Sequence, residues 1–283
     1  MAYIDRDAII NALTVSGYGQ RQTFTKVMAT NTVANTYTTL WDSGGIPVAG
    51  AYGGAAYTAV QCTSATTGAF ALTNATSPRN LFATGATGWS VTSASTGTIL
   101  VLDRLLQYDG INHATVGTTA MTNGVALPRY TTGAGVMAFL EVTTGLNATA
   151  HTVQLTYTDQ SGASGNVTTA ITPTASSAVR RVPYTGLYFP LASGDTGIRS
   201  VQNVIVASGG APTGTSSVIL AKPICEIPIP DVGVCGKYDA LLEEIDLPEL
   251  YDDHCLMFLV CSNAAATTPR YTGKLRAVEM AVA

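Results

Sequence analysis

The residues best suited to chemistry in this chain are its cysteines and histidines. They are Cys62, Cys225, Cys235, Cys255, Cys261, His113, His151 and His254. A zinc site drawn from Cys225, Cys235, His254 or Cys255, and Cys261 is conceivable by residue type, but the spacings match no closed zinc motif. The odd number of cysteines and the lack of a CxxC pair argue against a complete disulfide framework. The sequence therefore predicts no metal site.

Motifs for a nucleophile or for phosphate binding are not found either. The segment 162–165 lacks the GxSxG spacing of a nucleophile elbow. The glycine-rich runs at 50–54 and 209–214 lack the Lys-Ser/Thr pair of a phosphate loop. We therefore predict a protein that is not an enzyme, with no catalytic residue and no cofactor.

Acidic side chains gather near residue 250, in the C-terminal part of the chain. Glu249, Asp252 and Asp253 offer the oxygen ligands that Ca²⁺ takes. A solvated acidic face is the commoner origin of such a cluster, so it is not counted as a metal site.

The composition points to a protein that lives in contact with others. Charged residues make up only 11% of the chain, whereas a quarter is usual. By contrast, 42 residues are threonine. A surface of Thr, Ser and Gly needs little charge desolvation when a neighbour covers it. The alternative is an ordinary secreted β-protein, which shares the Thr and Gly bias.

Net charge and local sequence exclude several other partners. The formal net charge is −4 and Arg180-Arg181 is the only adjacent basic pair, which predicts no direct binding of nucleic acid. The N-terminus lacks the basic start and long apolar run of a signal peptide. No apolar stretch approaches the roughly 18 residues of a membrane helix. We expect the chain to be made in a reducing cytoplasm and not to enter a membrane.

Residues 1–25 are predicted to form an N-terminal arm. Asp5 can cap a short helix that ends near Leu13, and apolar residues fall at helical spacing. Such a helix is too short to be stable alone, so it needs a partner surface. The predicted partner contacts are Ile4, Ile9, Ile10 and Leu13. We expect a homo-oligomer with closed symmetry, of which a trimer is the favoured form.

Residues 26–95 are rich in Gly, Thr and Ala and predict a mixture of strand and loop. Aromatic residues recur there and are interpreted as anchors of a long ordered excursion: Trp41, Tyr52, Tyr57, Phe70, Phe82 and Trp89. The alternative is that Trp41, Trp89, Tyr52 and Tyr57 are exposed and bind carbohydrate. That alternative would make the chain an adhesion module.

Residues 96–283 predict the main β-sandwich, with an acidic segment in its C-terminal part. Short apolar or alternating runs separated by Gly and Pro are typical of strands. They cover 98–102, 136–142, 152–158, 166–172, 187–189, 198–206, 216–221, 256–260 and 274–282. One or two helical turns are expected within 238–247. The predicted fold class is all-β: an antiparallel β-sandwich or jelly-roll-like fold with an N-terminal arm and little helix.

Three stretches together resemble structural proteins of tailed bacteriophages that are encoded near the major capsid protein. They are Leu40–Pro47, the pair Leu102–Leu106 and Leu127–Val136, and Leu247–Val260. The resemblance implies a virion protein on the capsid surface, of the decoration or cement type, with the major capsid protein as its partner. A tail or head-fibre role is the alternative within the same resemblance. The stretches contain no catalytic motif, so no functional residue is transferred.

Overall fold

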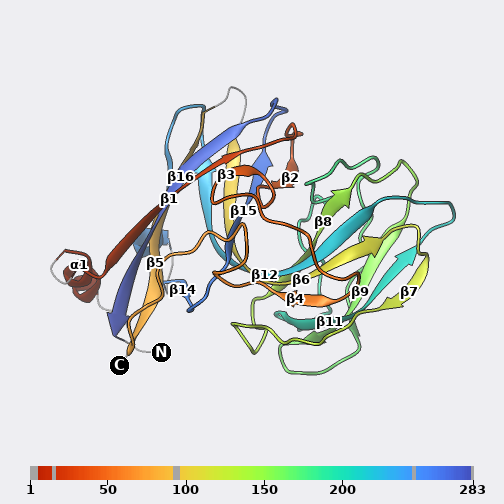
Figure 1. Cartoon of the computed structure of the whole chain (residues 1–283), viewed down its shortest axis with the longest axis horizontal. Helices are drawn as coiled ribbons and strands as arrows, with labels where there is room; N and C mark the ends of the chain where they lie inside the picture. Colours follow the sequence, from red (N-terminus) through yellow and green to blue (C-terminus); the bar gives the residue numbers. More distant parts are fainter. Residues whose placement is uncertain (1–5, 15–16, 92–95, 244–246, 282–283) are drawn as a thin grey trace.

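The computed structural model describes residues 6–14, 17–91, 96–243 and 247–281, and almost all of its regular structure is antiparallel β-sheet (Figure 1). The prediction of an all-β sandwich with little helix is confirmed. Only two short helices occur in the described ranges, α1 (Arg6–Thr14) and α2 (Ala240–Glu243). Neither of these helices is long and apolar enough to cross a bilayer.

The first sheet joins the two ends of the chain. Its order is β13-β5-β16-β1-β3, and β14 also pairs with β5. Its strands are β1 (Gly19–Val27), β3 (Gly44–Ile46), β5 (Arg79–Ser90), β13 (Gly236–Asp239), β14 (Glu249–Leu250) and β16 (Arg270–Ala281). Along β1, nine residues pair in register with β16, from Gly19 opposite Val278 to Val27 opposite Arg270.

The second sheet runs through the middle of the molecule. Its order is β2-β15-β6-β12-β8, and β4 pairs with β6 beyond the end of β15. Its strands are β2 (Thr36–Thr39), β4 (Ala59–Gln61), β6 (Gly97–Asn112), β8 (Met137–Thr144), β12 (Thr215–Ile229) and β15 (Leu256–Ser262). The two longest strands, β6 and β12, lie next to each other over nearly their full length.

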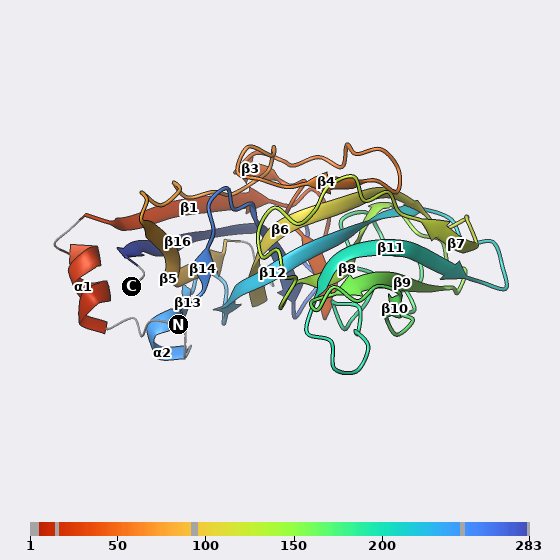
Figure 2. The same cartoon turned by 90° about the horizontal axis from the view of Figure 1, so that it is seen from below.

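The third sheet has the order β10-β9-β11-β7 and forms the end of the molecule opposite α1 (Figure 2). Its strands are β7 (Gly117–Ala120), β9 (Thr152–Asp159), β10 (Asn166–Val167) and β11 (Ile198–Ala207). β9 alternates strictly between buried and half-buried residues, as a strand with one face on a core should.

One face of the second sheet carries two hydrophobic cores. Ile99 and Val101 of β6 pack with residues of the first sheet such as Phe24, whereas Leu105 and Tyr108 pack with residues of the third sheet. Within the first core, the rings of Phe24 and Phe258 stack with centroids 4.1 Å apart. The molecule is thus two β-sandwiches that share their central strands.

The other face of the second sheet is covered by irregular chain. Leu100 and Leu102 point to this side and contact Trp41 and Cys62, which come from the glycine-rich excursion before β5. Trp41 is 1% exposed. Gly50 lies so close to the indole that a Cβ there would be 2.3 Å from a ring carbon, so only glycine fits.

Several predicted elements differ from the structure. β5 was not predicted, because Gly85 and Gly88 interrupt its apolar pattern; a Cβ at Gly88 would lie 3.1 Å from Ile99. Of the one or two helical turns expected within 238–247, α2 supplies one over 240–243, whereas 238–239 belong to β13 and 244–246 lie outside the described residues. Residues 187–189 form no strand, and only residues 166–167 of the strand expected over 166–172 do.

The predicted boundaries between the three regions of the chain fall at residues 25 and 95. Residue 25 falls inside β1, and residue 95 lies between β5 and β6. Strands from both sides of these positions pair with each other, as β1 does with β16 and β4 does with β6.

Candidate functional site

Helix α1 holds most of the residues predicted to contact a partner. Asp7 lies in its first turn, where a carboxylate is favourable. Ile9 is 2% exposed and packs, with Ala12, on Phe82, Val278 and Met280 of the first sheet. The helix therefore docks on its own chain through one face. Ile10 and Leu13 are 50% and 39% exposed and face solvent, whereas Ile4 lies outside the described residues.

A β-bulge in β6 brings a positive charge into the interior. Leu106 pairs with Leu220, whereas Arg104 pairs with Ala221, so the register between β6 and β12 slips by one residue here. Leu105 is the extra residue in β6. As a result, the side chains of Leu105 and Leu106 both point to the face of the second sheet that carries the two hydrophobic cores. The side chain of Arg104 points to the opposite face and is fully buried.

The charge of Arg104 is matched by a carboxylate on β8. Nη1 of Arg104 lies 2.8 Å from Oε2 of Glu141, and both side chains are 0% exposed. Nε and Nη2 of Arg104 donate to Oε1 of Gln107 at 3.2 and 2.9 Å. Burial lowers the pKa of Arg104, but the Glu141 carboxylate more than offsets this, so the guanidinium stays charged.

The network continues across the sheet to the excursion. Gln107 donates to Oδ2 of Asp109 at 2.8 Å, and Ser217 donates to Oδ1 of the same carboxylate at 2.6 Å. The backbone N–H of Gly54 donates to Asp109 at 2.7 Å. A chain of polar groups therefore connects β8, β6 and β12 to the loop above them.

The rings of Trp41 and Tyr52 lie next to the guanidinium of Arg104. The guanidinium carbon of Arg104 lies 4.4 Å from the ring centroid of Trp41 and 5.7 Å from that of Tyr52. Trp41 is buried and Tyr52 and Trp89 are half-buried, so an exposed platform of Trp41, Tyr52, Tyr57 and Trp89 does not exist. The interpretation of Trp41 as an anchor of the excursion is correct, and its use as a sugar platform is wrong.

A second buried ion pair lies next to the first. Arg129 donates from Nε and Nη2 to both carboxylate oxygens of Asp103, at 2.9 and 2.7 Å, and from Nη2 to the carbonyls of Cys62 and Arg104. Oδ1 of Asp103 also accepts from the N–H of Cys255 at 2.9 Å. The three stretches that carry the phage resemblance thus meet at Asp103 and Arg104.

The histidines are placed in two separate positions. His254 accepts from the N–H of Leu72 through Nε2 at 2.8 Å. His113 and His151 are 2.7 Å apart, and the other nitrogen of His113 lies 2.9 Å from Oγ of Ser216. Burial and the neighbouring His151 lower the pKa of His113 to about 4. His113 and Ser216 are both fully buried, so this Ser–His–His chain links β12 to the turn after β6 and the segment before β9, and has no access to a substrate.

The acidic cluster near residue 250 fixes loops. Oδ1 of Asp253 accepts from Ser64 and Asn74, and Asp252 accepts from the N–H of Ala75 at 3.2 Å. Across the described ranges, no group of three or more His, Cys, Asp and Glu side chains could hold a metal ion. All five cysteines are free thiols.

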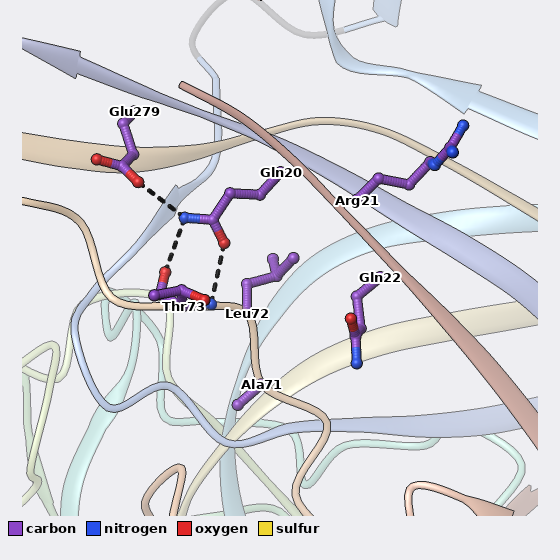
Figure 3. Close-up of a pocket in the computed structure, with 7 residues that line it drawn as sticks. All are labelled: Gln20, Arg21, Gln22, Ala71, Leu72, Thr73 and Glu279. Atoms are coloured by element: carbon purple, nitrogen blue, oxygen red, sulfur yellow. Dashed lines mark hydrogen bonds between the residues drawn. The ribbon is translucent and has the colours of Figure 1, made fainter. Parts of the chain in front are cut away.

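A cavity of about 560 Å³ lies between β1, β16 and the segment 71–73 (Figure 3). Gln20 spans it: its Nε2 donates to the carbonyl of Thr73 at 3.0 Å and to Glu279 at 2.9 Å, and its Oε1 accepts from the N–H of Thr73. Glu279 accepts from Thr76 as well. Because these groups satisfy one another, they hold the segment against the sheet.

Sequence reasoning missed the Arg104 network. The signal was present: Asp103 and Arg104 are adjacent charges inside an apolar run, in a chain with few charges. Such a pair in a strand requires buried partners.

Comparisons with known proteins identify no relative in sequence. No family model matches the chain, and no curated protein matches it. Among solved structures, a weak structural similarity is found to the infectious bursal disease virus VP2 subviral particle. It has a TM-score of 0.21 and 8% identity, and covers 93% of this chain and 81% of that one. A TM-score of this size carries no argument about fold or function.

Proposed function

We propose that the chain is a non-enzymatic structural subunit of a bacteriophage particle, and that it decorates the capsid as a cement protein. The observation that carries the proposal is an apolar end on a molecule with few charges. Ile10 and Leu13 of α1 and Leu242 of α2 are exposed, the last by 75%. The low charge of the chain and the resemblance of its three stretches to phage structural proteins add support.

The two helices that carry Ile10, Leu13 and Leu242 lie at one end of an elongated molecule. Figure 2 shows α1 and α2 at the end opposite β7 and β9. Each large apolar side chain that a partner covers completely contributes roughly 1.5–3 kcal/mol. Because Ile9 already anchors α1 on the first sheet, the helix presents Ile10 and Leu13 in an ordered form. Docking then avoids most of the entropy cost of ordering a free arm.

The proposed partner of this end is the major capsid protein, and the proposed assembly on the shell is a homotrimer. Closed symmetry is the rule for repeated subunits, and repeated contacts multiply a modest affinity. The protein is made in the host cytoplasm and ends on the capsid surface. Light scattering tests the oligomer: a trimer has three times the 29.2 kDa mass of one chain. A mass of one chain means that assembly occurs only on the shell.

Quantitative mass spectrometry of purified particles tests the role. We expect a copy number comparable to that of the major capsid protein. A few copies per particle would favour a tail or head-fibre subunit, and absence from particles would refute the proposal.

A double variant tests the contact. We expect Ile10→Ser with Leu13→Ser to reduce occupancy on particles while the protein stays folded, since both side chains face solvent. Val167→Ser is the matched control, because Val167 is 41% exposed but lies in the third sheet at the other end. If the double variant and the Val167→Ser control occupy particles equally, α1 only covers the end of the first sheet and makes no contact with the capsid.

A further inference from the structure

A second cavity lies where β5 begins and β14 ends. Its volume is about 490 Å³, within the range of roughly 300–1,000 Å³ that is usual for small-molecule sites. Its lining comes from three segments of the chain, 79–81, 128–132 and 249–252. Two of the three stretches that resemble phage proteins supply most of these residues. The proposed capsid contact does not use them.

Two tyrosines form an aromatic wall of this cavity. The rings of Tyr130 and Tyr251 meet edge to face, with centroids 4.7 Å apart and planes at 79°. The hydroxyl of Tyr130 donates to the carbonyl of Glu249 at 2.9 Å, which fixes its ring. Tyr251 is 42% exposed, so part of its ring is open to a ligand.

Planar polar groups surround the tyrosines. Asn80 donates to Oε1 of Glu249 at 2.6 Å, which leaves the amide oxygen of Asn80 as an acceptor. Arg129 is 4% exposed, and its Nη1 has no hydrogen-bond partner among the described residues. Asp103 holds the other two nitrogens of Arg129. Arg129 therefore lines the cavity as a fixed, largely buried cation.

The charges of the lining nearly balance. Arg79 and Arg129 stand against Glu249 and Asp252 in the lining, and Asp103 behind Arg129 brings the sum to −1. This small net charge repels anions and gives a cation, screened by solvent, little attraction. It suits a neutral ligand that has many hydrogen-bonding groups and an apolar face.

We propose that this cleft binds a neutral carbohydrate. The C–H face of a sugar ring packs against Tyr251, and neighbouring hydroxyls bind the planar groups of Asn80, Glu249 and Asp252. Sugar binding would come from this cleft and not from the aromatic residues of the excursion.

Saturation-transfer NMR on the full-length protein tests the site. The probes are glucose, galactose, N-acetylglucosamine and rhamnose, each in millimolar excess. We expect at least one sugar to receive saturation. Tyr251→Ala should weaken its binding about tenfold or more, and Asn80→Ala should weaken it as well. Tyr251→Phe keeps the ring and should retain most of the affinity.

Tyr184→Ala is the matched control, because Tyr184 is half-buried against the core of the other sandwich. Circular dichroism establishes that each variant is folded. The proposal is overturned if no sugar receives saturation, or if Tyr184→Ala weakens binding as much as Tyr251→Ala does. It is also overturned if inorganic phosphate or calcium chloride displaces the sugar at lower concentration than a second sugar does, because the site would then bind ions. None of these results depends on whether the protein is found on particles.

Discussion

At the residue scale, the interior of this protein is unusual for the charge it encloses. Arg104 and Glu141 have no solvent contact, and the Asp103–Arg129 pair is almost as buried. Removing two charges from water costs several kcal/mol per ion, and close pairing with full hydrogen bonding is needed to offset that cost. The pairs therefore specify which strands meet more than they add to stability.

Removing one partner of the Arg104–Glu141 pair should lower the free energy of unfolding far more than replacing both partners. Glu141→Ala leaves the Arg104 guanidinium buried without a counter-charge, so we expect a loss of about 3–5 kcal/mol in the free energy of unfolding. Arg104→Met combined with Glu141→Leu should lose clearly less, because no unpaired charge remains. Urea denaturation measures both. Equal losses would mean that packing, and not charge pairing, determines the effect.

The histidine pair makes a prediction about pH. In the unfolded chain His113 titrates near 6.5, whereas burial and His151 lower its pKa to about 4 in the folded protein. As the pH falls below 6.5, the unfolded chain takes up the proton first, so stability decreases until about pH 4. The decrease is at most about 1.4 kcal/mol per pH unit. Thermal unfolding of the wild type and of His113→Gln tests this. The variant should show a shallower decrease over that window, and parallel curves would contradict the assignment.

At the element scale, the bulge in β6 shows what the sequence could and could not predict. The run 98–102 predicts a buried strand by its residues alone, and the structure contains that strand within β6. Its continuation to Asn112 was missed because the bulge at Leu105 breaks the alternation. Periodicity assumes that side chains change faces at every residue, so one extra residue hides the rest of a strand.

The missed strand β5 and the polar cleft have a similar origin. Gly85 and Gly88 are in β5 because the neighbouring strands approach closely, and that approach is a tertiary property. Likewise, Tyr130 and Tyr251 are 121 positions apart in the sequence, and they meet only in the fold, where Tyr130 bonds to the carbonyl of Glu249 in β14. In contrast, the α1 helix and the strands β9 and β11 were predictable, since their patterns are local.

Gly97 tests how strictly one residue defines the start of β6. Its φ is +138°, and a Cβ would lie 2.0 Å from the carbonyl oxygen of Cys261. We expect Gly97→Ala to destabilise by roughly 1–3 kcal/mol or more, because backbone strain adds to the clash. Gly124→Ala is the control, since a Cβ there meets nothing within 4 Å, and it should stay within about 0.5 kcal/mol of wild type. A similar effect in both variants would show that β6 and β15 separate easily.

At the scale of the whole molecule, the two sandwiches are joined by strands that run through both of them. β6 contributes Ile99 to one core and Tyr108 to the other, and β12 contributes Ile227 and Val218 in the same way. Separating the sandwiches would require β6 and β12 to break in their middle, next to the buried Arg104–Glu141 pair. A molecule with this architecture transmits load through continuous strands and not through a linker.

This continuity predicts that both sandwiches unfold together. We expect a single calorimetric transition with equal calorimetric and van't Hoff enthalpies. Hydrogen exchange at low urea concentrations gives the sharper test, because it reports opening free energies strand by strand. Amides of β9 in one sandwich and of β16 in the other should open with the same free energy. Val153→Ala and Leu275→Ala, which each remove methyl groups from one core only, should lower both values alike. If Val153→Ala lowers the value for β9 and leaves that for β16 unchanged, the third sheet opens independently, and the shared strands do not couple the two cores.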